Sequence, residues 1–242
     1  MKEVRYFYVP NASEVSELPQ EEATHALRVL RLKDGDEMFL MDGVGAFYRA
    51  TVTMANNKHC FYQIEETIHP EKTWRNRIHL AVAPTKMIER MEWLAEKATE
   101  VGFDELSFLD CRFSERRVVR EDRIEKIVVS AMKQSRKPFK PMVNGMCPMT
   151  DFVAAQSKNA HRFIAHCYDE IEKKDFFDEL RQIDDNEEVI IMIGPEGDFS
   201  VEEVQQAMEV GYVSVSLGAS RLRTETAALS AVMMANLVFR KV

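Results

Sequence analysis

Hydrophobic and polar residues are patterned differently in the two parts of this chain. Before residue 72, short runs of aromatic and β-branched residues alternate with turn residues such as Asp42-Gly43, which predicts short strands in a small barrel. The predicted strands are Tyr6–Val9, Glu37–Met41, Ala46–Val52 and Cys60–Ile64. Between them, His25–Leu30 predicts a helical turn. We therefore expect a β-rich domain over residues 1–72.

From Ile78 onward, apolar runs alternate with segments of helical periodicity. The runs that predict strands are Ile78–Ala83, Leu106–Leu109, Phe163–Cys167, Val189–Ile193 and Val213–Leu217. The segments that predict helices are Lys86–Val101, Ile124–Arg136, Asp175–Gln182, Val201–Val210 and Glu225–Phe239. Strands that alternate with helices in this way indicate a parallel sheet covered on both faces. Residues 73–242 are therefore predicted to form an α/β domain.

The composition indicates a packed globular protein, and the charge pattern bears on its partners. The chain has 242 residues, of which 45% are hydrophobic, and a net charge of -8. A net negative charge by itself argues against a nucleic-acid partner. Residues 112–140, however, contain ten basic and four acidic side chains, whereas residues 151–198 contain five basic and thirteen acidic ones. Because polyanion binding depends on where the positive charge lies, this distribution is compatible with nucleic acid.

Two features of the sequence indicate the cellular compartment, and a third bears on metal binding. The four cysteines are widely separated, with no C-x-x-C pair, which is typical of a reduced, cytosolic chain. The longest uncharged apolar segment, Ala227–Phe239, has 13 residues, whereas a transmembrane helix needs roughly 20. The six histidines are scattered without metal-ligand spacing. We expect a cytoplasmic protein with no membrane contact and no metal.

Three signatures of other enzyme classes are absent or incomplete. No glycine is followed by lysine, so the P-loop motif is missing. Gly43-Val44-Gly45 lies between two predicted strands, which favours a hairpin turn over a dinucleotide-binding loop. The segment Gly218–Leu222 lacks the closing glycine of a nucleophile elbow. The sequence therefore disfavours a P-loop protein, a dinucleotide-dependent oxidoreductase and a serine hydrolase.

Candidate chemistry concentrates in two loops near the end of the chain. Gly194–Ser200 and Gly218–Ala227 each follow a predicted strand, at the edge where open α/β sheets bind ligands. Ser200 and Glu203 form a capping-box pattern that predicts the start of a helix. Either loop alone could be an ordinary connection between strand and helix. Together they favour a ligand site, because each has a carboxylate and Arg223 is expected to be buried beside Leu222.

These loops resemble those of a known family. The segments G-P-E-G-x-F-S and S-L-G-x-x-x-L-R-T-E-T-A are similar to motifs of the RsmE-type 16S ribosomal RNA methyltransferases, members of the SPOUT superfamily. Further matching segments are His25–Leu32, Gly35-Asp36, Asp42-Gly43, Met91–Trp93, Glu96–Gly102 and Ser114–Arg117. The chain departs from the family pattern at two usual glycine positions, which Asp198 and Arg136 occupy. The resemblance implies a PUA-like β-barrel followed by an α/β SPOUT domain with a C-terminal trefoil knot, a feature almost absent from proteins.

The resemblance also implies an activity. Members of the family methylate N3 of a uridine in 16S rRNA of the small ribosomal subunit, with S-adenosylmethionine as the methyl donor. Carried over by position, the cofactor-binding residues are Gly194, Glu196, Gly197, Leu217, Gly218, Leu222 and Thr226. The family's sites are completed by a second subunit, which implies a homodimer. Such an interface, or simple burial in the core, would explain why the helix Ala227–Val238 is broadly apolar.

Methylation at N3 of uracil requires that the ring lose the N3 proton, which leaves negative charge on the flanking carbonyl oxygens. A carboxylate base and an arginine would meet these needs. Glu196 and Glu225 are the candidate bases, Arg223 is the candidate cation, and Thr224 is a candidate positioning hydroxyl. An equally good explanation for Glu225 is that its carboxylate lies in the first turn of a helix and interacts favourably with the helix dipole. A catalytically silent SPOUT-like RNA-binding protein is the alternative, and the presence of these four residues argues against it.

Basic side chains are expected to contact the RNA, mostly at its phosphates. Arg116 and Arg117 follow a predicted strand in a loop, so a solvated helix face does not explain them well. The complete set of predicted RNA-binding residues is Arg5, Arg28, Arg31, Arg116, Arg117, Arg136 and Lys137. The sequence therefore predicts an RNA surface that includes the first domain and the segment after residue 112.

Overall fold

The computed structural model describes residues 5–241, and the chain forms two compact units. The first unit is Met1–Lys72 with Val129–Lys140, and the second is Thr73–Val128 with Pro141–Val242. Helix α3 (Glu121–Ser135) therefore begins in the second unit and ends in the first. Its Lys133 donates to the buried carboxylate of Glu22 at 2.6 Å, a contact within the first unit. Periodicity along the chain does not predict such a partner.

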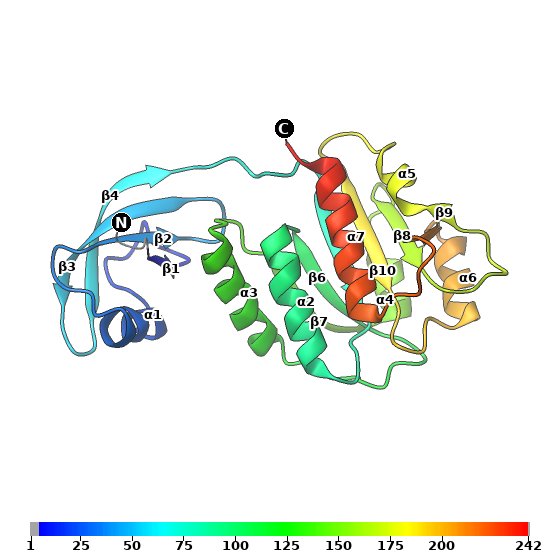
Figure 1. Cartoon of the computed structure of the whole chain (residues 1–242), viewed down its shortest axis with the longest axis horizontal. Helices are drawn as coiled ribbons and strands as arrows, with labels where there is room; N and C mark the ends of the chain where they lie inside the picture. The colour runs from blue at the N-terminus through cyan, green and yellow to red at the C-terminus, as the bar shows by residue number, and fades with distance from the viewer. Residues whose placement is uncertain (1–4, 242) are drawn as a thin grey trace. The chain divides into compact units, whose positions relative to one another are not determined.

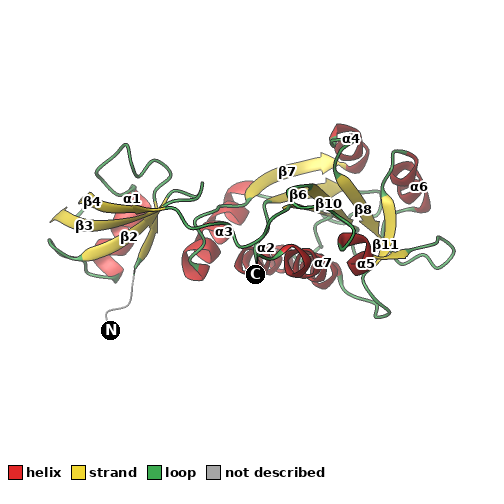
Figure 2. Cartoon of the chain, turned by 90° about the horizontal axis from the view of Figure 1, so that it is seen from above, coloured by secondary structure: helices red, strands yellow, loops and turns green. Residues whose placement is uncertain are grey.

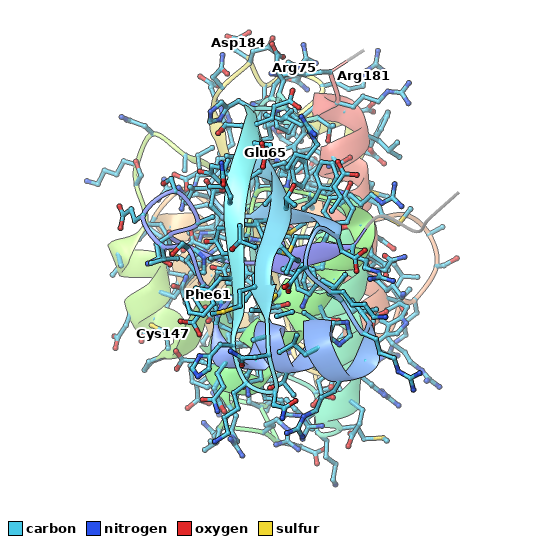
Figure 3. All side chains as sticks on the ribbon, turned by 90° about the vertical axis from the view of Figure 1, so that its left-hand side faces the viewer. Phe61, Glu65, Arg75, Cys147, Arg181 and Asp184 are labelled. Atoms are coloured by element: carbon cyan, nitrogen blue, oxygen red, sulfur yellow. The ribbon has the colours of Figure 1, made fainter. Side chains whose placement is uncertain are left out.

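The first unit contains a four-stranded sheet in the order β1-β2-β3-β4. Its elements are β1 (Tyr6–Tyr8), α1 (Gln20–Thr24), the π-helical turn η1 (His25–Val29), β2 (Glu37–Met41), β3 (Phe47–Ala55) and β4 (Cys60–Ile68). β1 runs parallel to β2, and the other neighbours are antiparallel. All four predicted strands and the helical turn are confirmed. Strands β3 and β4 extend beyond their predicted ends, and Phe61 and Glu65 mark positions along β4 in Figure 3.

The turn between β2 and β3 is built around a buried aspartate. The carboxylate of Asp42 accepts hydrogen bonds from the N–H groups of Val44, Gly45 and Ala46 at 2.8 to 3.0 Å. Tyr48 donates its hydroxyl to the same carboxylate at 3.2 Å, and its pKa is raised by burial and by the nearby negative charge. A short acidic side chain that bonds to the backbone ahead of it is a standard turn former, so the predicted Asp42-Gly43 turn is confirmed.

The second unit is built on seven parallel strands in the order β7-β6-β5-β10-β8-β11-β9. The strands are β5 (Arg77–Val82), β6 (Glu105–Asp110), β7 (Met142–Pro148), β8 (His161–Ala165), β9 (Lys174–Asp175), β10 (Glu188–Ile193) and β11 (Val213–Ser216). The central strands β5 and β10 are buried over almost their whole length. Burial on both faces explains why their sequences are continuous apolar runs rather than alternating ones.

Helices cover both faces of this sheet. α2 (Ile88–Val101), α5 (Phe176–Leu180) and α7 (Thr224–Phe239) lie on one face, and α4 (Met149–Ala155) and α6 (Val201–Glu209) lie on the other (Figures 1 and 2). One apolar core, with Leu94, Phe108 and Val232, fills the α2–α7 side, and another, with Phe152 and Val204, fills the opposite side. The predicted parallel α/β sheet is confirmed. Among residues 5–241, the structure contains no helix long and apolar enough to cross a membrane.

In the first unit α1 was not predicted, and in the second unit three short elements were not predicted. β7 and β9 are the two edge strands of the sheet, and α4 follows β7 directly. β7 contains Gly145 and ends at Pro148, residues that weaken a strand prediction but are tolerated at an edge. It forms because its backbone pairs with β6. Its existence therefore depends on a neighbour rather than on its own sequence pattern.

Candidate active site

The carboxyl edge of the parallel sheet holds both predicted loops. β5 pairs with β10 so that Val82 lies opposite Ile193, and the Ala83 N–H donates to the Ile193 carbonyl at 2.9 Å. The loop after β5, residues 83–87, therefore lies beside Gly194–Ser200. The loop at residues 217–223 follows β11 and leads into α7. Parallel strands all end at one edge, so the structure brings these loops to the same side of the sheet.

Gly194 and Asp198 determine the backbone of the first loop. A Cβ on Gly194 would lie 2.9 Å from the Phe199 nitrogen, so a larger residue does not fit without movement. Asp198 has a φ of 67°, in the left-handed region that favours glycine. Its carboxylate accepts hydrogen bonds from the N–H groups of Cys167 and Phe199, each at 2.8 Å. These bonds join the loop after β8 to the loop after β10 and offset the backbone strain.

The second loop combines an open backbone with apolar side chains. Gly218 has a φ of 119°, and no described heavy atom outside its immediate neighbours lies within 4 Å of where a Cβ would stand. Leu217 and Leu222 are half-buried, whereas Gly218 to Ser220 are exposed. Apolar side chains with peptide groups between them suit a flat heteroaromatic ring with polar edges. The residues present therefore fit the adenosine part of the expected cofactor.

Glu196 is exposed and contacts the loop after β5. The Lys86 N–H donates to Glu196 Oε1 at 3.0 Å. Arg116 Nε donates to the carbonyl oxygens of Thr85 and Lys86 at 3.1 Å each, and its Nη2 donates to Lys86 at 2.6 Å. The Lys86 ammonium forms an ion pair with Glu115 at 2.9 Å, and this hydrogen bond raises the pKa of Lys86. Arg116 thus holds the 83–87 loop beside Glu196, and its contact with RNA stays a prediction.

A pocket lies between the first turns of α2 and α7. It has a volume of about 300 Å³ and is lined by Glu89, Arg90, Trp93, Glu225 and Thr226. Arg90 Nε lies 3.7 Å from Glu225 Oε1. Glu225 is 8% exposed, and its Oε2 is buried without a hydrogen-bond partner among the described residues. One of the two predicted bases therefore lines a pocket with an unused carboxylate oxygen.

The expectation that Arg223 is buried is wrong. Its side chain is exposed because Arg223 is the N-cap residue of α7 and lies outside the helix, with φ -71° and ψ 156°. Thr224, the first helical residue, is buried instead. The Arg223 guanidinium is therefore accessible from solvent at the end of the second loop, next to Thr224 and Glu225.

A buried histidine supports the first loop, although the sequence pattern assigned it no role. His166 Nε2 lies 2.8 Å from Ser214 Oγ, and its Nδ1 accepts the Tyr168 N–H at 3.2 Å. Burial lowers the pKa of His166 and favours the neutral imidazole. The Tyr168 hydroxyl donates to the Phe199 carbonyl at 2.7 Å. The partners of His166 include Ser214, which is distant in the chain, so spacing along the sequence could not reveal the supporting role of this histidine.

The predicted RNA-binding cations lie in different environments. Arg28 and Arg31 are exposed in the first unit, and Arg5 is half-buried there. Arg117 forms an ion pair with Asp110. The remaining two are Arg136, which is exposed, and Lys137, which is half-buried. Their contact with RNA stays a prediction.

Arg136 has an unusual backbone for an arginine. It follows the end of α3 with a φ of 54°, a conformation that usually selects glycine at this position. Its guanidinium lies 5.4 Å from the centroid of the Tyr6 ring. Tyr6 in turn contacts Phe39 and Phe47, with ring centroids 5.5 and 5.6 Å apart. An aromatic cluster therefore holds the arginine that stands at the usual glycine position.

One group of described residues has the composition of a metal site, but it forms an ion-pair network. His79, Glu105 and Glu188 have ligand atoms within 4.8 Å of one another. Arg77 forms ion pairs with both carboxylates, so a protein cation already balances their charge. His79 is buried against Ser107 at 2.8 Å, and burial lowers its pKa to about 4. These residues lie near the amino ends of the strands, away from the two loops.

Comparison with known proteins agrees with this arrangement. Residues 72–236 match a family described as RNA methyltransferase domain, and residues 18–65 match RNA methyltransferase PUA domain. This chain belongs to the RNA methyltransferase family. The resemblance seen in the sequence motifs is thus confirmed, and it extends over both parts of the chain.

Three relatives of this RNA methyltransferase align over nearly their whole length. It is 25% identical over 224 residues to Ribosomal RNA small subunit methyltransferase E of Rickettsia conorii, covering 92% of this chain and 89% of that one. The solved structure of a probable rRNA-methyltransferase from Porphyromonas gingivalis is 41% identical, covers 98% of each chain and has a TM-score of 0.91. Ribosomal RNA small subunit methyltransferase E from Neisseria gonorrhoeae, solved bound to S-adenosyl methionine, is 26% identical, covers 95% of each chain and has a TM-score of 0.83.

Proposed function

We propose that this RNA methyltransferase transfers a methyl group from S-adenosylmethionine to N3 of a uridine in 16S rRNA of the small ribosomal subunit. The observation that supports this most is the pocket at the start of α7, where buried Glu225 has an unused oxygen beside an open glycine loop. The names of the relatives support the substrate, and the structure bound to S-adenosyl methionine supports the cofactor. The choice of N3 rests on the motif resemblance. A ribosomal RNA substrate would place the activity in the cytoplasm.

The cofactor in this proposal lies against the two loops at the carboxyl edge. When bound, it supplies an electrophilic methyl group on a sulfonium, whose carbon–sulfur bond breaks as the bond to N3 forms. The open face of Gly218 and the half-buried Leu217 and Leu222 suit its adenosine part. The residues proposed to hold it are Gly194, Glu196, Gly197, Leu217, Gly218 and Leu222. Thr226 was expected in this set, but it lines the pocket between α2 and α7, a position that suits contact with the substrate better.

The chain itself supplies the proton acceptor and the positive charge. Glu225 takes the N3 proton, since its Oε2 has no other partner among the described residues, and N3 then becomes nucleophilic. The exposed guanidinium of Arg223 stabilises the charge that develops on a flanking carbonyl oxygen. Thr224 begins α7 between these two residues and positions them. Glu196 is the second candidate base, and its bond to the Lys86 N–H orients the loop after β5.

Three features of the architecture belong to the same proposal. Residues 1–72 form an RNA-binding PUA-like barrel, and residues 73–242 form the catalytic SPOUT domain. In the second, β11 lies next to the edge strand, yet α7 packs on α2 and the central strand β5. The chain must cross back over the sheet to reach that position. We infer that this crossing passes through a loop of the chain and forms the trefoil knot that the resemblance implies.

We also propose that two copies of the chain form a homodimer through α7. On this helix Met233 and Leu237 are 44% and 53% exposed, and they stand four residues apart on one face. Burial in the core accounts for the opposite face, which includes Ala228, Ala231 and Ala235. The two explanations for the apolar helix therefore apply to different sides of it.

The decisive experiment is transfer of a labelled methyl group to small ribosomal subunits and to protein-free rRNA, followed by nucleoside analysis. We expect label in N3-methyluridine. Label in another nucleoside would overturn the substrate assignment, and its absence from every substrate would favour a catalytically silent RNA-binding protein. Arg223→Ala should retain cofactor binding and lose about 10²-fold or more in turnover. Unaltered turnover would remove Arg223 from the mechanism.

A further inference from the structure

The pocket between α2 and α7 presents a distinctive set of polar groups. Glu225 offers a carboxylate acceptor, Arg90 offers guanidinium donors, and Thr226 offers a hydroxyl. Arg90 Nε lies 3.7 Å from Glu225 Oε1, so donor and acceptor stand side by side. Thr226 directly follows Glu225 in the chain. The lining therefore offers a donor from Arg90, an acceptor from Glu225 and a donor from Thr226.

Uracil has the complementary pattern along the edge that contains N3. Its O2 and O4 atoms accept hydrogen bonds, and the N3–H between them donates one. Cytosine instead presents two acceptors followed by an amino donor, so its N3 lone pair would face a carboxylate. Because a buried carboxylate without a donor is strongly unfavourable, the lining matches uracil and rejects cytosine.

Trp93 gives the pocket a surface for the face of a base. Its side chain is 42% exposed at the pocket, although large apolar side chains elsewhere on α2, such as Met91 and Leu94, are fully buried. Exposed indoles are favoured stacking surfaces for unpaired bases, because every base has a π face. A volume of about 300 Å³ is enough for one base.

We propose that this pocket binds the uracil ring of the target nucleotide, with Trp93 stacked on its face and Glu225, Arg90 and Thr226 reading its N3 edge. The inference deepens the proposed function and rests on it for the identity of the reaction. It makes Trp93 and Arg90 substrate-binding residues and gives Glu225 two tasks. The same contact that accepts the N3–H for recognition places the carboxylate to remove that proton. Specificity for uracil and activation of N3 then depend on one side chain.

The test uses tryptophan fluorescence of the full chain titrated with uridine or cytidine. Trp93 is exposed and reports on stacking, whereas Trp74 is 2% exposed and contributes a constant background. Uridine should quench the emission and bind at least about fivefold more tightly than cytidine, since one good base-edge contact discriminates by about 1–3 kcal/mol. Absence of quenching by uridine, or equal affinity for the two nucleosides, would overturn the proposal.

Two amide variants identify the residue that reads the edge. In Glu225→Gln the amide can donate to cytosine N3, so the uridine preference should fall to about one. Glu89→Gln is the matched control, because Glu89 lines the same pocket but is exposed, and it should retain the preference. A loss of preference in Glu89→Gln alone would refute the role given to Glu225.

Methyl transfer separates this inference from the proposed function. Trp93→Ala should raise the KM for small subunits at least about fivefold, the lower end of base stacking on an aromatic residue, and Trp93→Tyr should largely restore it. If the natural protein methylates uridine N3 but uridine does not quench Trp93, the pocket assignment fails and the proposed function stands. If uridine binds selectively but no methyl is transferred, the proposed function fails and the pocket assignment stands.

Discussion

Asp198 provides a sharp test of how the first loop is held. The residue adopts a φ of 67°, where glycine would be less strained, yet its carboxylate accepts two backbone hydrogen bonds of 2.8 Å. Hydrogen bonds to a charged group contribute about 1.5–3 kcal/mol each when shielded, and the bond to Cys167 is exposed, so we take about 2–4 kcal/mol for the pair. The left-handed backbone costs about 1 kcal/mol more in alanine than in glycine.

These magnitudes predict an order of stability. Asp198→Ala loses both bonds and keeps the strain, so it should destabilise the protein by about 2–4 kcal/mol. Asp198→Gly also loses both bonds but relieves the strain, so its loss should be about 1 kcal/mol smaller. Asp198→Asn keeps one acceptor oxygen and should lie between the natural protein and the glycine variant. The assay is urea unfolding followed by circular dichroism at neutral pH.

One result would refute this reasoning. If Asp198→Gly were as stable as the natural protein, the backbone strain would equal or exceed the value of both hydrogen bonds. Asp198 would then be a tolerated departure from the family pattern rather than a link between two loops. An asparagine variant as unstable as the alanine variant would show that the negative charge, not the loop geometry, provides the stabilisation.

Three further predictions concern pH, RNA binding and assembly. Burial lowers the pKa of His79 from 6.5 to about 4. The neutral ring therefore stabilises the fold fully above the pKa of the unfolded chain, and this stability is lost as the pH falls toward 4. His79→Gln should flatten the fall in Tm between these pH values, and an unchanged fall would contradict this role of His79. Arg136→Gly removes about 1 kcal/mol of strain and the contact with Tyr6, worth about 0.5–1 kcal/mol. Its stability should therefore change little, while its RNA affinity falls and the salt slope drops by about one; unaltered affinity would exclude Arg136 from the interface. Leu237→Asp should fold normally but sediment as a monomer, whereas the natural protein sediments as a dimer; a variant that remains dimeric would refute the interface proposed on α7.

Local sequence predicted those parts of the fold whose partners are close along the chain. The Ser200–Glu203 capping box is present in both directions, with the Glu203 N–H donating to Ser200 Oγ at 3.2 Å and the Ser200 N–H donating to the Glu203 carboxylate at 2.7 Å. The Asp42 turn and the buried strands β5 and β10 were equally predictable. Each depends on a few consecutive residues or on a continuous apolar run, so the pattern alone was sufficient.

The roles of individual charged residues were less predictable. Arg116 belongs to a basic stretch that predicts RNA contact, and the structure adds a role that the stretch did not indicate, because its guanidinium bonds to the Thr85 and Lys86 carbonyls. Arg223 was expected to be buried and is exposed, since it lies just outside α7. A long cationic side chain can reach solvent, a carboxylate or a carbonyl from the same position. Which of these it meets depends on the loops that the fold places within its reach.

By itself the sequence determined the alternation of strands and helices, the two loops with their glycines, and the family to which they belong. Only the tertiary structure decided the strand order, the edge strand β7, the contact of Arg136 with Tyr6, and the meeting of Trp93 and Arg90 with Glu225. The first group follows from interactions between near neighbours in the chain. The second joins residues as far apart as α2 and α7, and such contacts form only when parallel strands bring distant segments to one edge and the helices pack over them.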